Sequence, residues 1–201
     1  MSAKEVRIFA GRWKGRLLEV PSGARPTSGR AREALFSIVS ESLRGAHVLD
    51  LYAGSGAVGL EAVSRGARRA VLVEQKPAAL DRNVARLPAE SGEIEVLRGS
   101  VGEALEALRR RRDHFDLVFS DPPYGSTAEA AVPQTLGEIL APGGLVIVQT
   151  DGRSRALTEP DGWTILSRRD YGRNVFFFFA RAESSLKLPM PESFDGREGK
   201  C

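Results

Sequence analysis

The chain has 201 residues, of which 42% are hydrophobic and 27% charged, and its net charge is +3. This size suits one domain with a small extension and allows a sizeable buried core. Its one cysteine, Cys201, is the last residue, which excludes a disulfide framework and a cysteine-based zinc site. It also argues against methylation at C5 of a pyrimidine, which needs a cysteine thiolate as nucleophile.

Basic residues are concentrated near the N-terminus. Residues 1–32 carry eight basic and two acidic side chains, a net charge of +6, so the remaining residues sum to −3. This asymmetry favours a phosphate-backbone partner reached through the basic segment, although a solvated arginine-rich surface explains it equally well. The basic start of the chain lacks the continuous apolar segment of a signal peptide, and no apolar run is long enough to span a bilayer. We therefore expect a cytoplasmic protein without membrane contact.

The first 45 residues are predicted to form a hairpin, a loop and a helix. Two short strands, Val6–Ala10 and Arg16–Val20, flank the turn Gly11–Gly15. Apolar residues at helical spacing then predict one helix over Arg30–Leu43, which Gly45 ends. Trp13 is expected to pack on the domain rather than to stack on a base.

From residue 47 onward, strands and helices alternate. The predicted strands are His47–Tyr52, Ala70–Glu74, Ile94–Leu97, Phe115–Ser120 and Leu145–Gln149, and the predicted helices are Ala57–Arg65, Pro77–Leu87, Val101–Arg112 and Ala128–Ile139. Strand runs such as AVLVE and LVIVQ are continuously apolar, as in sheets covered by helices on both faces. The pattern predicts an α/β fold with a doubly wound, mostly parallel, Rossmann-like sheet.

The C-terminal part breaks this alternation. Trp163–Ser167 and Asn174–Ala180 are predicted strands with a turn but no helix between them. They complete a seven-stranded sheet in which the last strand runs antiparallel. We therefore expect a basic hairpin and loop extension at 1–28, the main domain at 29–182, and a mobile tail at 183–201.

The stretch VLDLYAGSGAVGLEA contains the pattern G-x-G-x-x-G at Gly54, Gly56 and Gly59. Glycines at a strand–helix junction let the backbone turn tightly and approach a ligand at the helix N-terminus. Glu74 ends the next apolar run, where a carboxylate accepts hydrogen bonds from ribose hydroxyls. Asp50 precedes the first glycine by four residues, and its carboxylate would repel a diphosphate but attract a cationic sulfonium. We therefore expect S-adenosylmethionine as the cofactor rather than NAD.

A second motif, FSDPPYG, follows the fourth predicted strand of the main domain. Because the carboxyl ends of the strands in an open α/β sheet line one crevice, Asp121 is expected to face the same cleft as Asp50. Pro122 and Pro123 stiffen the loop. The Asp121 carboxylate and the Pro122 carbonyl can hold both N–H groups of an exocyclic amine, while Tyr124 stacks on the planar substrate. This arrangement favours methylation of a conjugated amine by positioning and electrostatics.

With these motifs, the chain resembles class I S-adenosylmethionine-dependent methyltransferases. More narrowly, it is similar to the bacterial small-subunit ribosomal RNA guanine-N2 methyltransferase family. That resemblance rests on RIFAGRWKGRLLEVP, RPTSGRAREALFSIV, DLYAGSGAVGLEA and DPPY, and it covers residues 6–182. It implies methyl transfer to the N2 amine of a guanine in 16S ribosomal RNA, either as RNA or in an assembling small ribosomal subunit.

The candidate residues fall into three groups. The catalytic group is Asp121, Pro122, Pro123 and Tyr124, and the cofactor group is Asp50, Tyr52, Gly54, Gly56, Glu74, Gln75 and Ser100. By the resemblance, the RNA face carries Arg7, Arg12, Lys14, Arg16, Arg25, Thr27 and Arg30. Ser100 stands where many relatives have an acidic residue near the adenine, and Asp121 stands where the family often has Asn. Neither His47 nor His114 is assigned to a metal, and nothing in the sequence requires more than a monomer.

Three alternatives remain open. The DPPY motif also fits methylation of adenine N6 in DNA or of a protein glutamine. Against these, the chain has no spare segment for DNA target recognition, and a glutamine enzyme does not need a basic N-terminus. A nicotinamide-dependent oxidoreductase explains the glycines and Glu74 but neither Asp50 nor DPPY. A non-catalytic RNA-binding module predicts RNA binding without a product.

Overall fold

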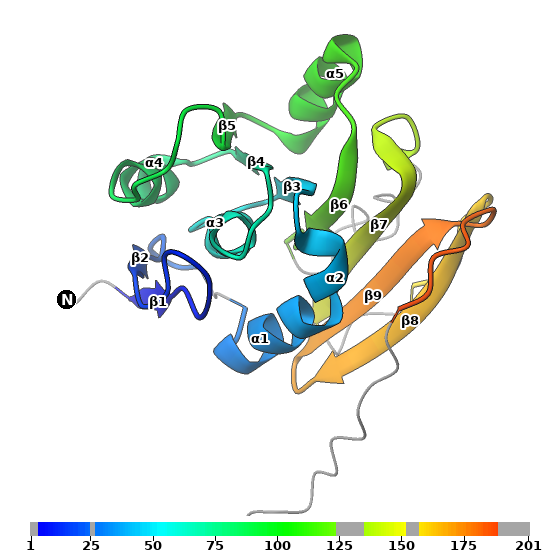
Figure 1. The fold of residues 1–201 in the computed structure, drawn as a ribbon, viewed down its shortest axis with the longest axis horizontal. Helices are drawn as coiled ribbons and strands as arrows, with labels where there is room; N and C mark the ends of the chain where they lie inside the picture. The colour runs from blue at the N-terminus through cyan, green and yellow to red at the C-terminus, as the bar shows by residue number, and fades with distance from the viewer. Residues whose placement is uncertain (1–3, 25–26, 124–134, 152–156, 189–201) are drawn as a thin grey trace, which may run out of the picture.

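The computed structural model describes residues 4–24, 27–123, 135–151 and 157–188, and a seven-stranded sheet lies at its centre (Figure 1). Its strands are β3 (His47–Leu51), β4 (Arg69–Glu74), β5 (Ile94–Arg98), β6 (Phe115–Ser120), β7 (Leu140–Asp151), β8 (Trp163–Tyr171) and β9 (Asn174–Arg181). The strand order is β5-β4-β3-β6-β7-β9-β8, with β3 to β7 parallel and β9 antiparallel to both of its neighbours. The predicted mostly parallel sheet with a C-terminal antiparallel strand is confirmed.

Helices cover both faces of the sheet (Figure 1). They are α1 (Gly29–Ile38), α2 (Ser40–Leu43), α3 (Ala57–Ser64), α4 (Ala78–Ala85) and α5 (Val101–Arg111). Apolar side chains of α1 to α4 share one hydrophobic cluster with alternate residues of the strands, and α5 shares a second cluster with the other set. Side chains alternate between the faces of a strand, so continuously apolar strands give the sheet two buried faces.

One predicted helix is in fact two. The periodicity over Arg30–Leu43 predicted a single helix, but α1 ends at Ile38 and α2 begins at Ser40. Val39 between them has φ −93° and ψ 8°. At this break the Ser40 hydroxyl donates a hydrogen bond to the Ser37 carbonyl, 3.0 Å away. Such local side-chain bonds compete with the helical hydrogen-bond pattern, and periodicity does not reveal them. Most of the helix predicted at 128–139 lies outside the described residues.

The N-terminal hairpin forms a small sheet of β1 (Glu5–Arg7) and β2 (Leu17–Glu19) that is packed firmly on the domain. Ile8, Trp13 and Leu18 are buried in the same cluster as α1 to α4, so the prediction that Trp13 packs on the domain is confirmed. The turn between the strands rests on α3, because the Trp13 N–H donates to the Ser64 hydroxyl at 2.9 Å. The hairpin therefore contributes to the core and is not a detachable arm.

A buried ion pair reinforces this docking. Glu61 of α3 is fully buried and accepts hydrogen bonds from Arg32 of α1 and from Arg65, with the Arg32 Nε lying 3.0 Å from the Glu61 Oε2. Arg32 also donates to the backbone carbonyl of Arg7 in β1. Burial lowers the pKa of Arg32, while the Glu61 carboxylate opposes that shift. Arg32, counted above in the basic segment, therefore holds β1, α1 and α3 together.

The C-terminal segment continues to pack beyond β9. Leu186 and Leu188 are partly buried against the cluster that contains α1 to α4. The predicted mobile tail at 183–201 thus includes residues that contact the core, and 189–201 lie outside the described part. Among the described residues, no helix combines the length and the apolar character that crossing a bilayer requires.

Candidate active site

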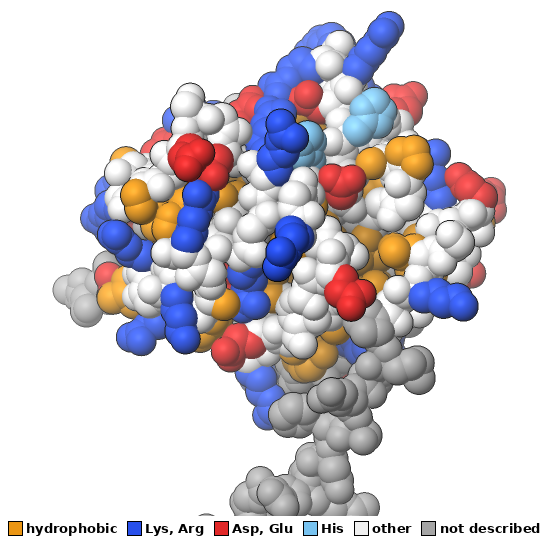
Figure 2. All heavy atoms as spheres, viewed as in Figure 1, with side chains coloured by type: hydrophobic (Ala, Val, Ile, Leu, Met, Phe, Trp, Pro, Cys, Tyr) orange, Lys and Arg blue, Asp and Glu red, His pale blue; other side chains and the backbone are white. Residues whose placement is uncertain are grey.

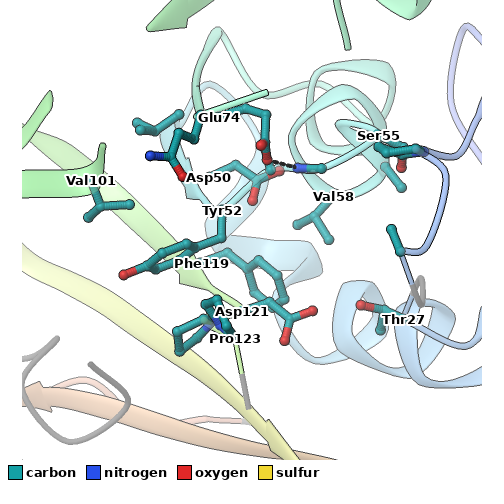
Figure 3. Close-up of a pocket in the computed structure, with 18 of the residues that line it drawn as sticks. Thr27, Asp50, Tyr52, Ser55, Val58, Glu74, Val101, Phe119, Asp121 and Pro123 are labelled. Carbon is teal, nitrogen blue, oxygen red and sulfur yellow. Dashed lines mark hydrogen bonds between the residues drawn. The ribbon is translucent and has the colours of Figure 1, made fainter. Parts of the chain in front are cut away.

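A cavity of about 950 Å³ lies at the carboxyl ends of the parallel strands. Most of the predicted cofactor and catalytic residues line it: Asp50, Tyr52, Gly54, Glu74, Gln75, Ser100, Asp121, Pro122 and Pro123. Figure 3 labels five of them, Asp50, Tyr52, Glu74, Asp121 and Pro123. The prediction that Asp121 faces the same cleft as Asp50 is confirmed. Gly56 is not among the lining residues, and Tyr124 and Arg25 lie outside the described part of the chain.

The glycine loop connects β3 to α3 in a conformation that glycine favours. Gly54 and Gly56 have φ values of 58° and 78°, in the left-handed region. At Gly56 a Cβ would also lie 2.5 Å from the Leu80 Cδ1, so this glycine shapes the loop from behind the cavity wall. The Gly54 N–H donates to the Glu74 Oε2 at 2.8 Å, which fixes the Glu74 carboxylate at the tip of β4 (Figure 3).

Asp50 lies beneath the loop, at the carboxyl end of β3. Its side chain is buried, and its Oδ2 accepts a hydrogen bond from the Gly59 N–H at 2.8 Å. Burial raises the pKa of Asp50 to about 7, the Gly59 hydrogen bond opposes this shift, and the charge of Glu74 adds to it. Burying this carboxylate is therefore costly, and a cation in the cavity would offset the cost.

We expect Asp50→Asn to change stability and cofactor affinity in opposite directions. Because the pKa of Asp50 is raised from 3.8 to about 7, the unfolded chain loses this proton first as pH rises. The contribution of Asp50 to folding stability thus declines as the pH rises from 3.8 to about 7. In the absence of cofactor, the variant should melt at a higher temperature than the parent protein at pH 8. The difference in melting temperature should become smaller toward pH 5.

At pH 8 the same variant should bind S-adenosylmethionine about tenfold or more weakly, because the negative charge near the sulfonium and ammonium groups is lost. Isothermal titration calorimetry and thermal melts measure the two effects. The matched control is Asp161→Asn, which removes an exposed carboxylate before β8. Unchanged cofactor affinity in Asp50→Asn would contradict the role given to this residue.

Asp121 lies at the other end of the cavity, directly after β6. Figure 3 shows its carboxylate apart from those of Asp50 and Glu74, with Thr27 on a neighbouring wall. The Asp121 Oδ2 accepts a hydrogen bond from the Gln149 Nε2 of β7 at 3.0 Å. Two acidic groups at one end and one at the other leave room between them for a cofactor and an acceptor.

Two other predicted cofactor residues shape the cavity through the backbone. Tyr52 has φ 61°, which is unusual for a residue other than glycine, and strain of this kind is typical of functional sites. Burial raises the pKa of its phenol. Ser100 is the N-cap of α5: its hydroxyl donates to the Glu103 Oε2 at 2.6 Å, and the Ser100 N–H donates to the same oxygen. Ser100 thus fixes the start of α5 at the cavity wall.

The segment that follows the hairpin forms part of the cavity. Val20, Pro21, Gly23, Ala24 and Thr27 are among its lining residues. Asn83 of α4 ties this segment to the glycine loop, because its Nδ2 donates to the carbonyls of Glu19 and Ser55, each at 2.9 Å. Asn83 is fully buried, so these bonds hold the hairpin at a fixed position beside the site.

The residues expected on the RNA face differ in exposure. Arg7, Arg12, Lys14, Arg16 and Arg30 are exposed, and Figure 2 shows Lys and Arg side chains over the hairpin and α1. Arg12 forms an ion pair with Glu93 at 2.5 Å and lies over the Trp13 ring. Thr27 lines the cavity, where its hydroxyl donates to the Gln149 Oε1 at 3.0 Å. Thr27 therefore lies at the Asp121 end of the cavity.

Gln149 and Asn83 are the residues that sequence reasoning missed. Gln149 is 1% exposed and ends the apolar run LVIVQ, just as Asp50 and Glu74 end or interrupt theirs. A polar residue at the carboxyl end of a buried strand was the signal that could have identified it. Asn83 carries no comparable signal, because its partners come from β2 and the glycine loop.

The charge in the cavity distinguishes between ligand classes. Its described lining residues include three carboxylates, from Asp50, Glu74 and Asp121, and no lysine or arginine. A dinucleotide diphosphate would meet repulsion here. A ligand with a sulfonium and an ammonium group and no phosphate would meet attraction. The Glu74 carboxylate accepts two backbone N–H groups and has lone pairs left for two ribose hydroxyls.

Comparisons with known proteins agree with this geometry. Residues 6–180 match the sequence model of the family described as conserved hypothetical protein 95. The chain is 37% identical over 177 residues to ribosomal RNA small subunit methyltransferase D of Haemophilus influenzae, covering 84% of this chain and 90% of the relative. The Escherichia coli protein of that name is 33% identical over 187 residues, with 88% and 90% covered.

Among solved structures, the Escherichia coli protein yhhF superposes with a TM-score of 0.75 at 33% identity. That match covers 89% of this chain and 98% of the other. The residues that the family model matches, 6–180, include most of the N-terminal hairpin as well as the sheet domain.

Proposed function

The chain belongs to the family described as conserved hypothetical protein 95, and we propose that it methylates the exocyclic N2 amine of a guanine in small-subunit ribosomal RNA. The fold is that of class I methyltransferases, and the methyl donor is S-adenosylmethionine. The observation that carries the proposal is the charge of the cavity. Its described charged lining residues are all acidic, and one of them, Asp121 of the DPPY loop, lies at one end. The names of the two bacterial relatives support small-subunit RNA as the substrate.

Each end of the cavity has its own role. Glu74 binds the ribose hydroxyls and Asp50 supplies negative charge near the cationic groups, while the backbone at Gly54 permits close approach. When bound, S-adenosylmethionine supplies an electrophilic methyl group with a good leaving group. Acid–base catalysis is therefore needed only at the acceptor amine.

At the acceptor end, Asp121 is proposed to activate the guanine amine. The lone pair of a guanine amine is delocalised into the ring, so the amine is a poor nucleophile. A carboxylate that accepts one N–H hydrogen bond increases electron density on the nitrogen and favours its pyramidal form. Asp121 can then accept the proton that the methylated nitrogen releases. The Pro122 carbonyl and Tyr124 are proposed to hold the second N–H and the ring.

RNA is proposed to reach the site over the hairpin. Lys14 and Arg16 are exposed in the hairpin, and the segment that follows it lines the cavity, so a phosphate backbone held there would lie beside the catalytic end. Backbone contacts of this kind make the affinity dependent on salt. The hairpin turn packs closely on α3, because the Trp13 N–H donates to the Ser64 hydroxyl and a Cβ on Gly11 would lie 1.8 Å from the Ser64 carbonyl oxygen. The hairpin should therefore be tested by changing its charges, not by deleting it.

We expect Lys14→Gln/Arg16→Gln to weaken RNA binding about tenfold at moderate salt, with a shallower dependence of log affinity on log salt. The matched control is Arg110→Gln/Arg112→Gln, which removes two exposed charges at the end of α5, away from the carboxyl ends of the strands. Filter binding or fluorescence anisotropy across a salt series measures both. Equal losses in the two variants would mean that the hairpin has no special role in binding RNA.

The substrate class can be tested with the purified protein and S-adenosylmethionine carrying a labelled methyl group. We expect label to enter small-subunit RNA or small subunits prepared without this modification. Large-subunit RNA, duplex DNA and a bulk protein fraction should remain unlabelled. Label in DNA or protein alone would support one of the rival amine methyltransferases, and binding of NAD in preference to S-adenosylmethionine would contradict the cofactor assignment.

A further inference from the structure

Gln149 lies at the centre of a hydrogen-bond network around Asp121. It is 1% exposed and occupies β7 on the face that packs against α1 to α4, opposite Phe176 of β9. Its Nε2 donates to the Asp121 Oδ2 at 3.0 Å and to the Asn174 Oδ1 at 3.3 Å. Its Oε1 accepts from the Thr27 hydroxyl at 3.0 Å. Both N–H donors and the oxygen of the amide thus form hydrogen bonds with side chains from three other segments.

The network reaches the first turn of α1. The Asn174 Nδ2 donates to the Ser28 Oγ at 3.1 Å, and the same oxygen accepts from the Ala31 N–H as the N-cap of α1. Asp121 is therefore linked through Gln149 to β9 and to the N-terminal end of a packed helix. Polar groups joined in this way restrict one another's rotamers.

The direction of the bonds matters for the chemistry. Thr27 donates to the amide oxygen, which orients the amide so that its N–H groups face Asp121 and Asn174. The reversed amide would place an oxygen against the carboxylate. A neutral donor on one carboxylate oxygen favours the ionised form and fixes the orientation of the carboxylate group.

We propose that Gln149 is a positioning residue for methyl transfer, which holds the Asp121 carboxylate ionised and aimed at the acceptor amine, with Thr27 fixing the orientation of the Gln149 amide. This inference rests on the proposed function, because it assigns to Gln149 a role that acts only through Asp121. It also explains why an amide side chain is buried at the end of the apolar run LVIV in β7.

The central test is Gln149→Leu, which keeps the approximate volume and removes both amide groups. We expect kcat to fall about 10- to 100-fold through loss of alignment, with the KM for RNA and the Kd for S-adenosylmethionine changed less than threefold. The matched control is Thr150→Val, at the next position of β7 on the opposite face, where a buried hydroxyl is removed without touching Asp121. This control should retain nearly full activity.

A double-mutant cycle separates positioning from a general structural effect. In the Asp121→Ala background, Gln149→Leu should cause little further loss of kcat, because the group it acts through is already absent. Thr27→Val, which removes only the hydroxyl that orients the amide, should give a smaller loss in the same direction. It also provides a milder variant if Gln149→Leu does not fold, as judged by circular dichroism and thermal melts.

The outcomes distinguish this inference from the function on which it rests. If the parent protein methylates small-subunit RNA and Gln149→Leu is equally active, the positioning role is wrong and the proposed function stands. Equal losses from Gln149→Leu in the parent and in the Asp121→Ala background would likewise overturn it. If the parent protein itself transfers no methyl group to small-subunit RNA, the proposed function fails.

Discussion

Asp121→Ala is expected to lower kcat for methyl transfer by about 10³-fold or more while S-adenosylmethionine binds with nearly unchanged affinity. The size of the loss follows from the two tasks proposed for the carboxylate, hydrogen bonding to the amine and acceptance of its proton. Cofactor binding should persist because Asp121 lies at the opposite end of the cavity from Asp50 and Glu74 (Figure 3).

Single-turnover transfer of labelled methyl groups and calorimetric titration with the cofactor measure these two properties separately. Asp121→Asn is the informative companion, because it retains one acceptor oxygen but cannot take a proton. High activity in this variant would show that Asp121 acts chiefly by positioning, and activity as low as in Asp121→Ala would show that the charge or proton transfer is required. Loss of cofactor binding in Asp121→Ala would contradict the division of roles between the two ends of the cavity.

Glu61→Ala is expected to lower the free energy of unfolding by about 3–5 kcal/mol, because it leaves the guanidinium of Arg32 buried without its partner. The exposed fractions of the Arg32 and Glu61 side chains are 2% and 0%. A loss of this size is a large share of the 5–15 kcal/mol typical of a domain. Since Arg32 also contacts the Arg7 carbonyl, RNA affinity should fall with the stability of the hairpin.

The matched control is Glu95→Ala, which breaks contacts to Arg69 and Arg111 at an edge of the sheet. These side chains are 29–38% exposed, so we expect a loss of only about 0–1 kcal/mol. Urea denaturation of the three proteins, followed by circular dichroism, compares them directly. A Glu61→Ala variant as stable as Glu95→Ala would show that the buried pair does not hold the hairpin in place.

The sequence identified the carboxyl-end residues because each interrupts or ends an apolar strand. Asp50, Glu74 and Asp121 all show this pattern, and parallel strands place such ends at one edge of the sheet. The mostly parallel sheet and its C-terminal antiparallel hairpin followed from the same alternation of apolar runs and turns. These features depend on local sequence and on general rules of connection, so they could be predicted.

What could not be predicted depends on contacts between distant segments. Thr27 and Gln149 are 122 residues apart, so the motif that contains Thr27 gave no indication that its hydroxyl orients an amide beside Asp121. Arg32 was counted as part of a basic surface, but packing of α1 on α3 buries it against Glu61. In both cases only tertiary packing determined the role of the residue.

The central claim, methyl transfer to a guanine N2 amine, is tested most directly by identifying the product. Small subunits and their RNA, prepared without this modification, would be incubated with the protein and S-adenosylmethionine, digested to nucleosides and analysed by mass spectrometry against authentic standards. The account predicts new N2-methylguanosine with the parent protein and none with Asp121→Ala. N6-methyladenosine as the only new product would contradict the proposed acceptor while leaving the fold and the cofactor site unchanged.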